Sequence, residues 1–169
     1  MLHSDKNTSL KIQCNEALDL CISIEKEGII YYEKFSKLVK NPKVKKIFCR
    51  LAEDEREHSK SLKGKAKFLQ PALQKKFESN DSLNSFFQKE VKGKIFPLNF
   101  DEDDSSKSDK EAVEIGIQSE KRSIEILLKL LENEKKMDVR VVFSHLLAEE
   151  KKHLIALENL KNELLAEES

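Results

Sequence analysis

The sequence predicts an all-α protein built as a four-helix bundle, in which two helix pairs are joined by a long crossover. Its composition favours helix, because the 169 residues include only four glycines and three prolines and are rich in Lys, Glu and Leu. Apolar residues also recur at helical spacing over four long segments, at about 11–39, 42–69, 110–131 and 137–166. A chain of this length is most simply a single domain over 1–169, with a helix pair at 11–69, a crossover at 71–109 and a helix pair at 110–166.

Local signals indicate where these helices end. Asn41-Pro42 separates the first two, because Pro is well tolerated at the first position of a helix. Pro71 is a stop signal after the second, and the acidic, serine-rich stretch 101–106 predicts a solvated loop before the third. A connection as long as 71–109 is unusual between antiparallel neighbours, so we expect it to run back along the bundle and start the third helix at the other end.

The composition excludes several classes of protein. Charged residues make up 37% of the chain and cancel to a net charge of zero, which argues against a nucleic-acid or anionic-membrane binder. No apolar run approaches the ~20 residues of a membrane span, and the N-terminus lacks the apolar middle of a signal peptide. Cys14, Cys21 and Cys49 form no Cys-x-x-Cys pair, which excludes a rubredoxin-type or zinc-ribbon site within this chain. We expect a cytoplasmic protein whose three cysteines are packing residues.

An internal repeat carries the chemistry. Glu55 and His58 stand three residues apart, so they point the same way on a helix, and Glu150 and His153 do the same. Each pair interrupts an apolar stripe, and every member of the second stripe lies 95 residues after its counterpart in the first. The first stripe is Val44, Phe48, Leu51, Glu55, His58 and Leu62, and the second is Val139, Phe143, Leu146, Glu150, His153 and Leu157.

Two further acids obey the same repeat. Glu25 lies in the middle of the apolar stripe of the first helix, and Glu120 lies at the matching position of the third, again 95 residues later. Other acids of the first helix, such as Glu27, fall off the stripe and can be solvated. Each half of the chain therefore provides a Glu, followed thirty residues later by a Glu-x-x-His pair.

Four acids and two histidines buried together predict a metal site. Burying one unpaired carboxylate costs several kcal/mol, and metal ions would offset that cost. Carboxylate and imidazole ligands suit iron or manganese. The alternative is a bundle whose Glu and His pairs are hydrogen-bonded core polar groups or partly exposed salt bridges. The remaining histidines, His3 and His145, share neither repeat nor stripe and are expected on the surface. The acids next to the predicted ligands are expected to be solvated or to support them, namely Glu53, Asp54, Glu57 and Glu149.

Both halves of the chain resemble rubrerythrin-type proteins, a group of ferritin-like di-iron carboxylate proteins. In the first half the resemblance lies in Ile24-Glu25-Lys26-Glu27-Gly28-Ile29-Ile30-Tyr31-Tyr32 and Leu51-Ala52-Glu53-Asp54-Glu55-Arg56-Glu57-His58. In the second half it lies in Glu120 and Leu147-Ala148-Glu149-Glu150-Lys151-Lys152-His153. The resemblance implies a ferritin-like four-helix bundle that binds two iron ions, with manganese or a mixed pair as alternatives. It implies that Glu55 and Glu150 bridge the metals. Glu25 and Glu120 would be terminal ligands, and His58 and His153 would each serve one metal.

The chain departs from this family at two points. Rubrerythrins that reduce peroxide carry an extra glutamate one turn after the third-helix ligand, where this chain has Ser123. They also usually carry a rubredoxin domain that delivers electrons, and this chain has no cysteine pairs for one. The resemblance therefore implies an oxidoreductase that reacts with hydrogen peroxide or dioxygen and takes electrons from an external donor, such as a rubredoxin-type protein. The alternatives are a ferroxidase linked to iron storage or delivery, and a helical interaction protein with a vestigial metal site.

Two expectations concern residues outside the ligand set. Tyr32 has Leu127 as its repeat counterpart, so a phenol stands near the site on one side only, where it either orients a ligand carboxylate or packs. The family resemblance and the exposed-looking phenylalanines of the crossover predict a homodimer, although these side chains could equally cover the end of the bundle. They are Phe86, Phe87, Phe96 and Phe100.

Overall fold

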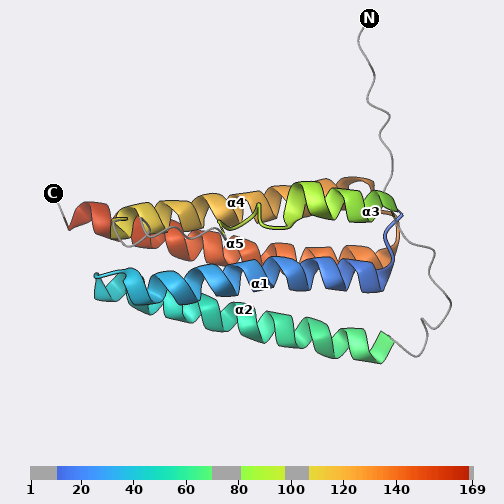
Figure 1. Cartoon of the computed structure of the whole chain (residues 1–169), viewed down its shortest axis with the longest axis horizontal. Helices are drawn as coiled ribbons and strands as arrows, with labels where there is room; N and C mark the ends of the chain where they lie inside the picture. Colours follow the sequence, from blue (N-terminus) through green and yellow to red (C-terminus); the bar gives the residue numbers. More distant parts are fainter. Residues whose placement is uncertain (1–10, 70–80, 98–106, 168–169) are drawn as a thin grey trace, which may run out of the picture.

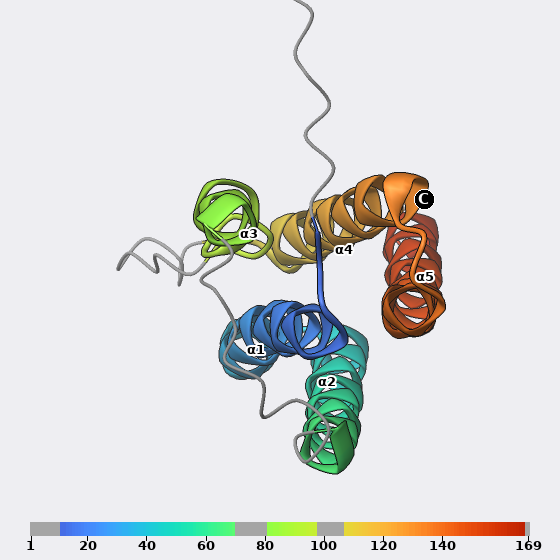
Figure 2. The same ribbon diagram turned by 90° about the vertical axis from the view of Figure 1, so that its right-hand side faces the viewer.

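The computed structural model describes residues 11–69, 81–97 and 107–167, and these ranges contain helices and connecting turns but no strand (Figure 1). Four long helices form the bundle, and two short elements of the crossover pack beside it (Figure 2). The bundle confirms the predicted all-α, ferritin-like fold. The long helices are α1 (Cys14–Leu38), α2 (Pro42–Leu69), α4 (Asp109–Asn133) and α5 (Met137–Ala166), and the short elements are α3 (Asp81–Phe86) and the π-helical η2 (Phe87–Val91).

The helix ends follow from local hydrogen bonds. The bounds of α2 and α5 coincide with the predicted segments, whereas α1 begins at Cys14, three residues later than expected. It starts there because the Gln13 backbone N–H donates to the Glu16 carboxylate (2.7 Å), as in a capping box. The α4 helix begins after Ser108, which exchanges the same kind of hydrogen bonds with Glu111.

The crossover returns along the length of the bundle, as predicted. In Figure 1, α2 ends at the right and α4 begins at the left, beside the turn between α1 and α2. The Asp109 carboxylate fixes this position, because it accepts hydrogen bonds from the backbone N–H groups of Lys40 (2.9 Å) and Asn41 (2.5 Å). An acid in the first turn of α4 thus also satisfies backbone donors at the end of α1. Pro71 and the acidic stretch 101–106 lie outside the described residues.

Glu27 anchors the crossover to α1, so the interpretation that it can be solvated was wrong. Its side chain is buried, and its two carboxylate oxygens accept hydrogen bonds from the backbone N–H groups of Gly93 and Phe96. Gly93 has φ = 69°, a left-handed conformation that glycine adopts at little cost. Burial raises the pKa of Glu27, while the backbone donors oppose that rise.

The crossover also contributes to the core. Of the two readings left open for Phe96, exposure and cover for the bundle, the structure contradicts exposure: Phe96 is buried, with its ring centroid 5.5 Å from that of Tyr31 and 5.6 Å from that of Tyr32. Phe86 and Phe87 are partly buried against the core, and Phe100 lies outside the described residues. The homodimer stays a prediction.

The predicted apolar stripes form the interior of the bundle. Val44, Phe48 and Leu51 from α2 and their repeat counterparts from α5 are buried, which confirms the orientation assigned to both helices. The three cysteines are free: Cys21 is buried, Cys14 is half-buried, and Cys49 is exposed. The expectation that all three are packing residues was therefore wrong for Cys49.

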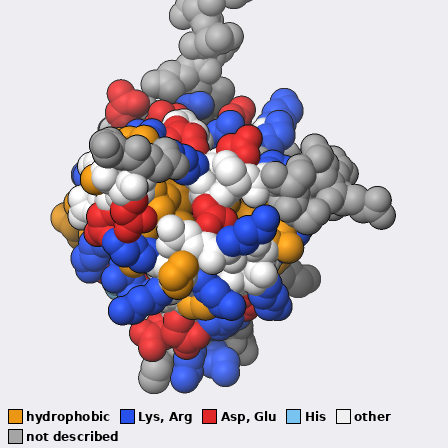
Figure 3. All heavy atoms as spheres, turned by 90° about the vertical axis from the view of Figure 1, so that its left-hand side faces the viewer, with side chains coloured by type: hydrophobic (Ala, Val, Ile, Leu, Met, Phe, Trp, Pro, Cys, Tyr) orange, Lys and Arg blue, Asp and Glu red, His pale blue; other side chains and the backbone are white. Residues whose placement is uncertain are grey.

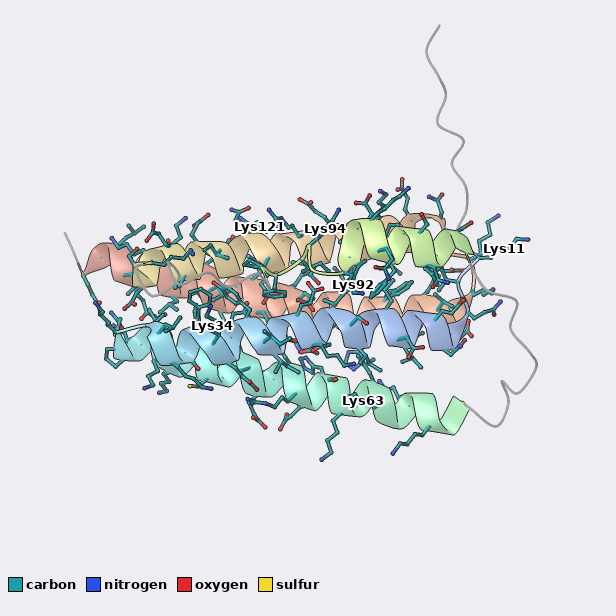
Figure 4. The ribbon with its side chains drawn as sticks, viewed as in Figure 1. Lys11, Lys34, Lys63, Lys92, Lys94 and Lys121 are labelled. Carbon is teal, nitrogen blue, oxygen red and sulfur yellow. The ribbon has the colours of Figure 1, made fainter. Side chains whose placement is uncertain are left out.

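Charged side chains cover the outside of the bundle. At the end where α1 meets α2 and α5 ends, basic and acidic side chains are interspersed (Figure 3), and Lys43 pairs there with Glu167 (2.6 Å). The lysines labelled in Figure 4 come from α1, α2, α4 and the segments before α1 and after η2, and all are exposed or half-buried. Within the described residues, no helix has both the length and the apolar character that crossing a membrane requires.

Candidate metal centre

The six residues predicted to bind metal come from all four long helices and meet inside the bundle. Glu25 lies on α1, Glu55 and His58 on α2, Glu120 on α4, and Glu150 and His153 on α5. Because each occupies a core position of its helix, the packing of the apolar stripes carries the polar groups inward together. The four carboxylates are at most 1% exposed.

Glu55 lies between the two histidines. Its Oε1 is 3.5 Å from Nδ1 of His153, and its Oε2 is 4.0 Å from Nδ1 of His58. The two imidazole rings are stacked, with centroids 5.6 Å apart and planes at 21°. One carboxylate of α2 thus faces a nitrogen from its own helix and a nitrogen from α5.

Two overlapping sets of donor atoms are close enough to surround metal ions. Glu55, Glu120, Glu150 and His153 each offer one ligand atom, and these atoms all lie within 4.8 Å of one another; Glu55, His58 and His153 form a second such set. Glu25 belongs to neither set, although its Oε1 lies 3.7 Å from Nδ1 of His58. The residues therefore offer oxygen and imidazole donors on two sides of Glu55.

The donor atoms themselves argue that a cation belongs here. Among the described residues, several buried atoms of the cluster have no hydrogen-bond partner: both carboxylate oxygens of Glu25 and of Glu150, one oxygen each of Glu55 and Glu120, and Nδ1 of both histidines. Buried polar groups left unpaired cost on the order of 1–3 kcal/mol each, and more when charged. A pair of divalent ions would satisfy all these acceptors at once, so the residues fit a two-metal centre.

The pKa values of the acids in the metal-free cluster also reflect the cost of burying them as charged groups. Burial and then the neighbouring carboxylate of Glu55 raise the pKa of Glu25, and burial raises that of Glu120 to about 7. Burial, followed by the adjacent Glu120, raises the pKa of Glu150 well above its usual range. Glu25 and Glu150 therefore hold protons at neutral pH and Glu120 holds one about half of the time, unless a cation replaces those protons.

The two histidines differ in their surroundings. Burial lowers the pKa of His58 more than the nearby acids raise it. Burial also acts to lower the pKa of His153, but Glu55 and Glu150 outweigh it, so the net shift is upward. In both residues Nδ1 faces the cluster. The Nε2 of His58 faces outward, 3.5 Å from a carboxylate oxygen of Glu149. A carboxylate at this position favours the ring orientation that turns Nδ1 toward the cluster.

Tyr32 contacts the cluster directly, so it does more than pack. Its buried hydroxyl donates a hydrogen bond to Oε1 of Glu120, across the interface between α1 and α4. The adjacent Tyr31 instead donates to the backbone carbonyl of Ala112 (2.5 Å). The repeat counterpart of Tyr32 is Leu127, which has no hydroxyl, so only one half of the site has this support.

Sequence reasoning missed Gly28, one turn after Glu25. A Cβ atom built on Gly28 would lie 2.5 Å from Oε1 of Glu55, so only glycine leaves room for that carboxylate. Its repeat counterpart, Ser123, is fully buried and its hydroxyl has no partner among the described residues. The sequence does place Gly28 three residues after Glu25, on the same face of the helix. The role of this glycine becomes clear only when the position of the Glu55 carboxylate is known. His145 is exposed, as expected, and His3 lies outside the described residues.

Comparison with known proteins agrees with this geometry. The family model described as Rubrerythrin matches residues 16–161, which include all six residues of the cluster. No curated protein and no solved structure matched the chain. The family match covers most of the sequence and both halves of the repeat. The chain therefore belongs to the rubrerythrin family.

Proposed function

We propose that this protein is a di-iron carboxylate oxidoreductase that reduces hydrogen peroxide or dioxygen with electrons from an external donor. The observation that supports this most is the set of four carboxylates and two imidazoles that meet inside an apolar bundle with their acceptor atoms unpaired. Membership of the rubrerythrin family favours iron, although manganese or a mixed pair would suit the same donors.

In this proposal the six residues divide into bridging and terminal ligands. Glu55 and Glu150 would be the bridging ligands, which is supported for Glu55 by its place between the two histidines. Glu25 and Glu120 would be terminal ligands, and the Nδ1 atoms of His58 and His153 would each serve one metal. Gly28, one turn after Glu25 on α1, leaves space for the Glu55 carboxylate, and Tyr32 donates a hydrogen bond to Glu120.

Two ferrous ions in this site would supply the two electrons that convert hydrogen peroxide and two protons into two water molecules. The chain's own residues set the conditions. Glu25 and Glu150 hold protons in the metal-free protein and must release them when the metals bind. The buried apolar stripes on α2 and α5 keep bulk water away from the cluster.

We propose an external electron donor, such as a rubredoxin-type protein. The 169 residues contain three cysteines and no Cys-x-x-Cys pair, so they offer no rubredoxin-type site to relay electrons inward. A small external carrier would re-reduce the centre after each turnover.

Rapid mixing of the ferrous-loaded protein with hydrogen peroxide tests the proposal. We expect oxidation much faster than that of free Fe(II), with one peroxide consumed for each pair of ferrous ions. Oxidation no faster than that of free Fe(II) would rule out the redox function. Elemental analysis of protein made in iron-rich medium separates this proposal from a vestigial site, for which less than about half an equivalent of metal is expected.

A further inference from the structure

The cluster is buried unequally on its two sides. The side chain of His58 is 22% exposed, whereas that of His153 is 4% exposed and the four carboxylates are at most 1% exposed. Solvent therefore approaches the cluster from the side of His58. Because the cluster is assembled from a sequence repeat, we compare the residues at matching positions around the two histidines.

A small cavity accounts for the exposure of His58. It lies between α2 and α5, has a volume of about 40 Å³, and reaches from the exposed Ser61 and His145 down to the fully buried Glu25. Leu62 and Leu146 form apolar parts of its wall, and His58 and Glu149 supply polar ones. Both carboxylate oxygens of Glu25, at its inner end, have no hydrogen-bond partner among the described residues.

The other half of the repeat differs at this place. The counterparts of His145 and Glu149 are Arg50 and Asp54, which pair with each other along α2 at 3.9 Å. Glu149 instead lies against His58 and pairs with Lys152 (2.8 Å), leaving His145 at the mouth of the cavity. The repeat thus has an open side at His58 and a closed side at His153.

We propose that this cavity is the access route to the centre and that it admits only a small polar oxidant of at most about four heavy atoms, such as hydrogen peroxide. This inference rests on the proposed function. A water molecule needs roughly 10–15 Å³ of such volume, so 40 Å³ accommodates about three or four water-sized atoms. Pockets for larger organic ligands are typically several hundred Å³, so organic hydroperoxides are excluded. The polar groups at both ends suit a molecule that donates and accepts hydrogen bonds.

Binding of azide to the oxidised, iron-loaded protein tests the route without any turnover. Ser61→Phe narrows the cavity from α2, and His145→Trp narrows it from α5; both positions are exposed, so the fold should tolerate the substitutions. Ala156→Phe, at the repeat counterpart of Ser61, is the matched control. Stopped-flow absorbance should show azide associating at least tenfold more slowly with both narrowed variants and at the wild-type rate with the control. Wild-type association rates in both narrowed variants, or equal slowing in the control, would overturn the proposal.

A comparison of oxidants tests the size limit. Hydrogen peroxide should oxidise the ferrous-loaded protein at least about a hundredfold faster than tert-butyl hydroperoxide, and equal rates would contradict the assigned size. The two proposals fail differently. If neither peroxide reacts but azide association still slows only in the two narrowed variants, the redox function is wrong and the access route stands.

Discussion

The Glu55 carboxylate occupies the space that a side chain at Gly28 would fill. A Cβ atom at position 28 would lie 2.5 Å from Oε1 of Glu55 and 3.1 Å from its Cδ. At the matching position of the other half, the buried Ser123 has a side chain where Gly28 has none. The two proposed bridging carboxylates therefore have different residues at matching positions, although the repeat relates them.

Replacing Gly28 by alanine should weaken metal binding by about tenfold or more, a loss of the size seen when groups that orient metal ligands are changed. The obstructing atom is the far end of a flexible side chain, so Glu55 can move aside and the fold should survive. The measurement is iron content by elemental analysis after equilibration with limiting Fe(II), together with the melting temperature of the metal-free protein.

Gly64→Ala is the control for that substitution. It also places alanine inside a helix, but its Cβ would meet nothing within 4 Å. Alanine favours helix over glycine by about 1 kcal/mol, so Gly64→Ala should melt slightly higher and bind iron as the wild type does. Wild-type iron binding by Gly28→Ala would refute the role assigned to this glycine.

Removing the Tyr32 hydroxyl should affect the metal centre more than the fold. Tyr32→Phe deletes the hydrogen bond to Glu120 and leaves that carboxylate free to rotate, so we expect metal affinity to fall about tenfold. Tyr31→Phe is the matched control, because it deletes a buried hydroxyl that bonds to the Ala112 carbonyl instead. It should cost about 1 kcal/mol of stability and leave metal affinity unchanged. Titration with Fe(II) and chemical unfolding separate the two effects, and equal metal affinities in both variants would show that Tyr32 only packs.

The repeat made the bundle and the cluster predictable from sequence. Glu25 and Glu120 could be recognised because each interrupts an apolar stripe at matching positions, and burial of a charge in a stripe has few physical explanations. The bounds of α2 and α5 were predictable for a related reason, since long periodic segments leave little choice of helical face.

The remaining features depend on contacts between distant segments. Glu27 looks like a surface acid on its own helix, and it is buried only because the backbone around Gly93 and Phe96 provides donors for it. Phe96 follows a short irregular segment, where periodicity gives no information about its partners. Similarly, Glu149 was left open between solvated and supporting roles, because the choice depends on how α5 faces His58.

The metal-free protein should lose stability as the pH rises from about 4.5 to 7. The pKa of Glu120 rises from 4.5 to about 7 on folding, and those of Glu25 and Glu150 rise as well. In this range the folded protein binds more protons than the unfolded chain, so the free energy of unfolding falls with increasing pH. The histidine pKa values shift in opposite directions, so the effect of His58, which opposes this slope, is countered by that of His153.

Metal loading should reverse that dependence. The metal ions replace the protons on these carboxylates, so metal affinity increases as the pH rises. Tighter binding to the folded state increases the free energy of unfolding. Urea unfolding at pH 5, 6 and 7, with and without saturating Mn(II) as an air-stable substitute, measures both trends. Metal-free stability that stays constant or increases between pH 5 and 6 would mean that the carboxyl groups are not buried as described.

Replacing Glu149 by glutamine should weaken one metal position selectively. Its carboxylate faces Nε2 of His58 at 3.5 Å, so it favours the tautomer that leaves Nδ1 free to bind metal. Glutamine is isosteric but uncharged, and its amide can present a donor to that nitrogen, so we expect the affinity for one of the two metals to fall by about tenfold. Asp54→Asn, at the repeat counterpart, is the control, because Asp54 pairs with Arg50. Calorimetric titration should resolve one weakened and one unchanged site in Glu149→Gln and two unchanged sites in Asp54→Asn. Loss of both sites in Glu149→Gln would show that the carboxylate supports the whole cluster and not His58 alone.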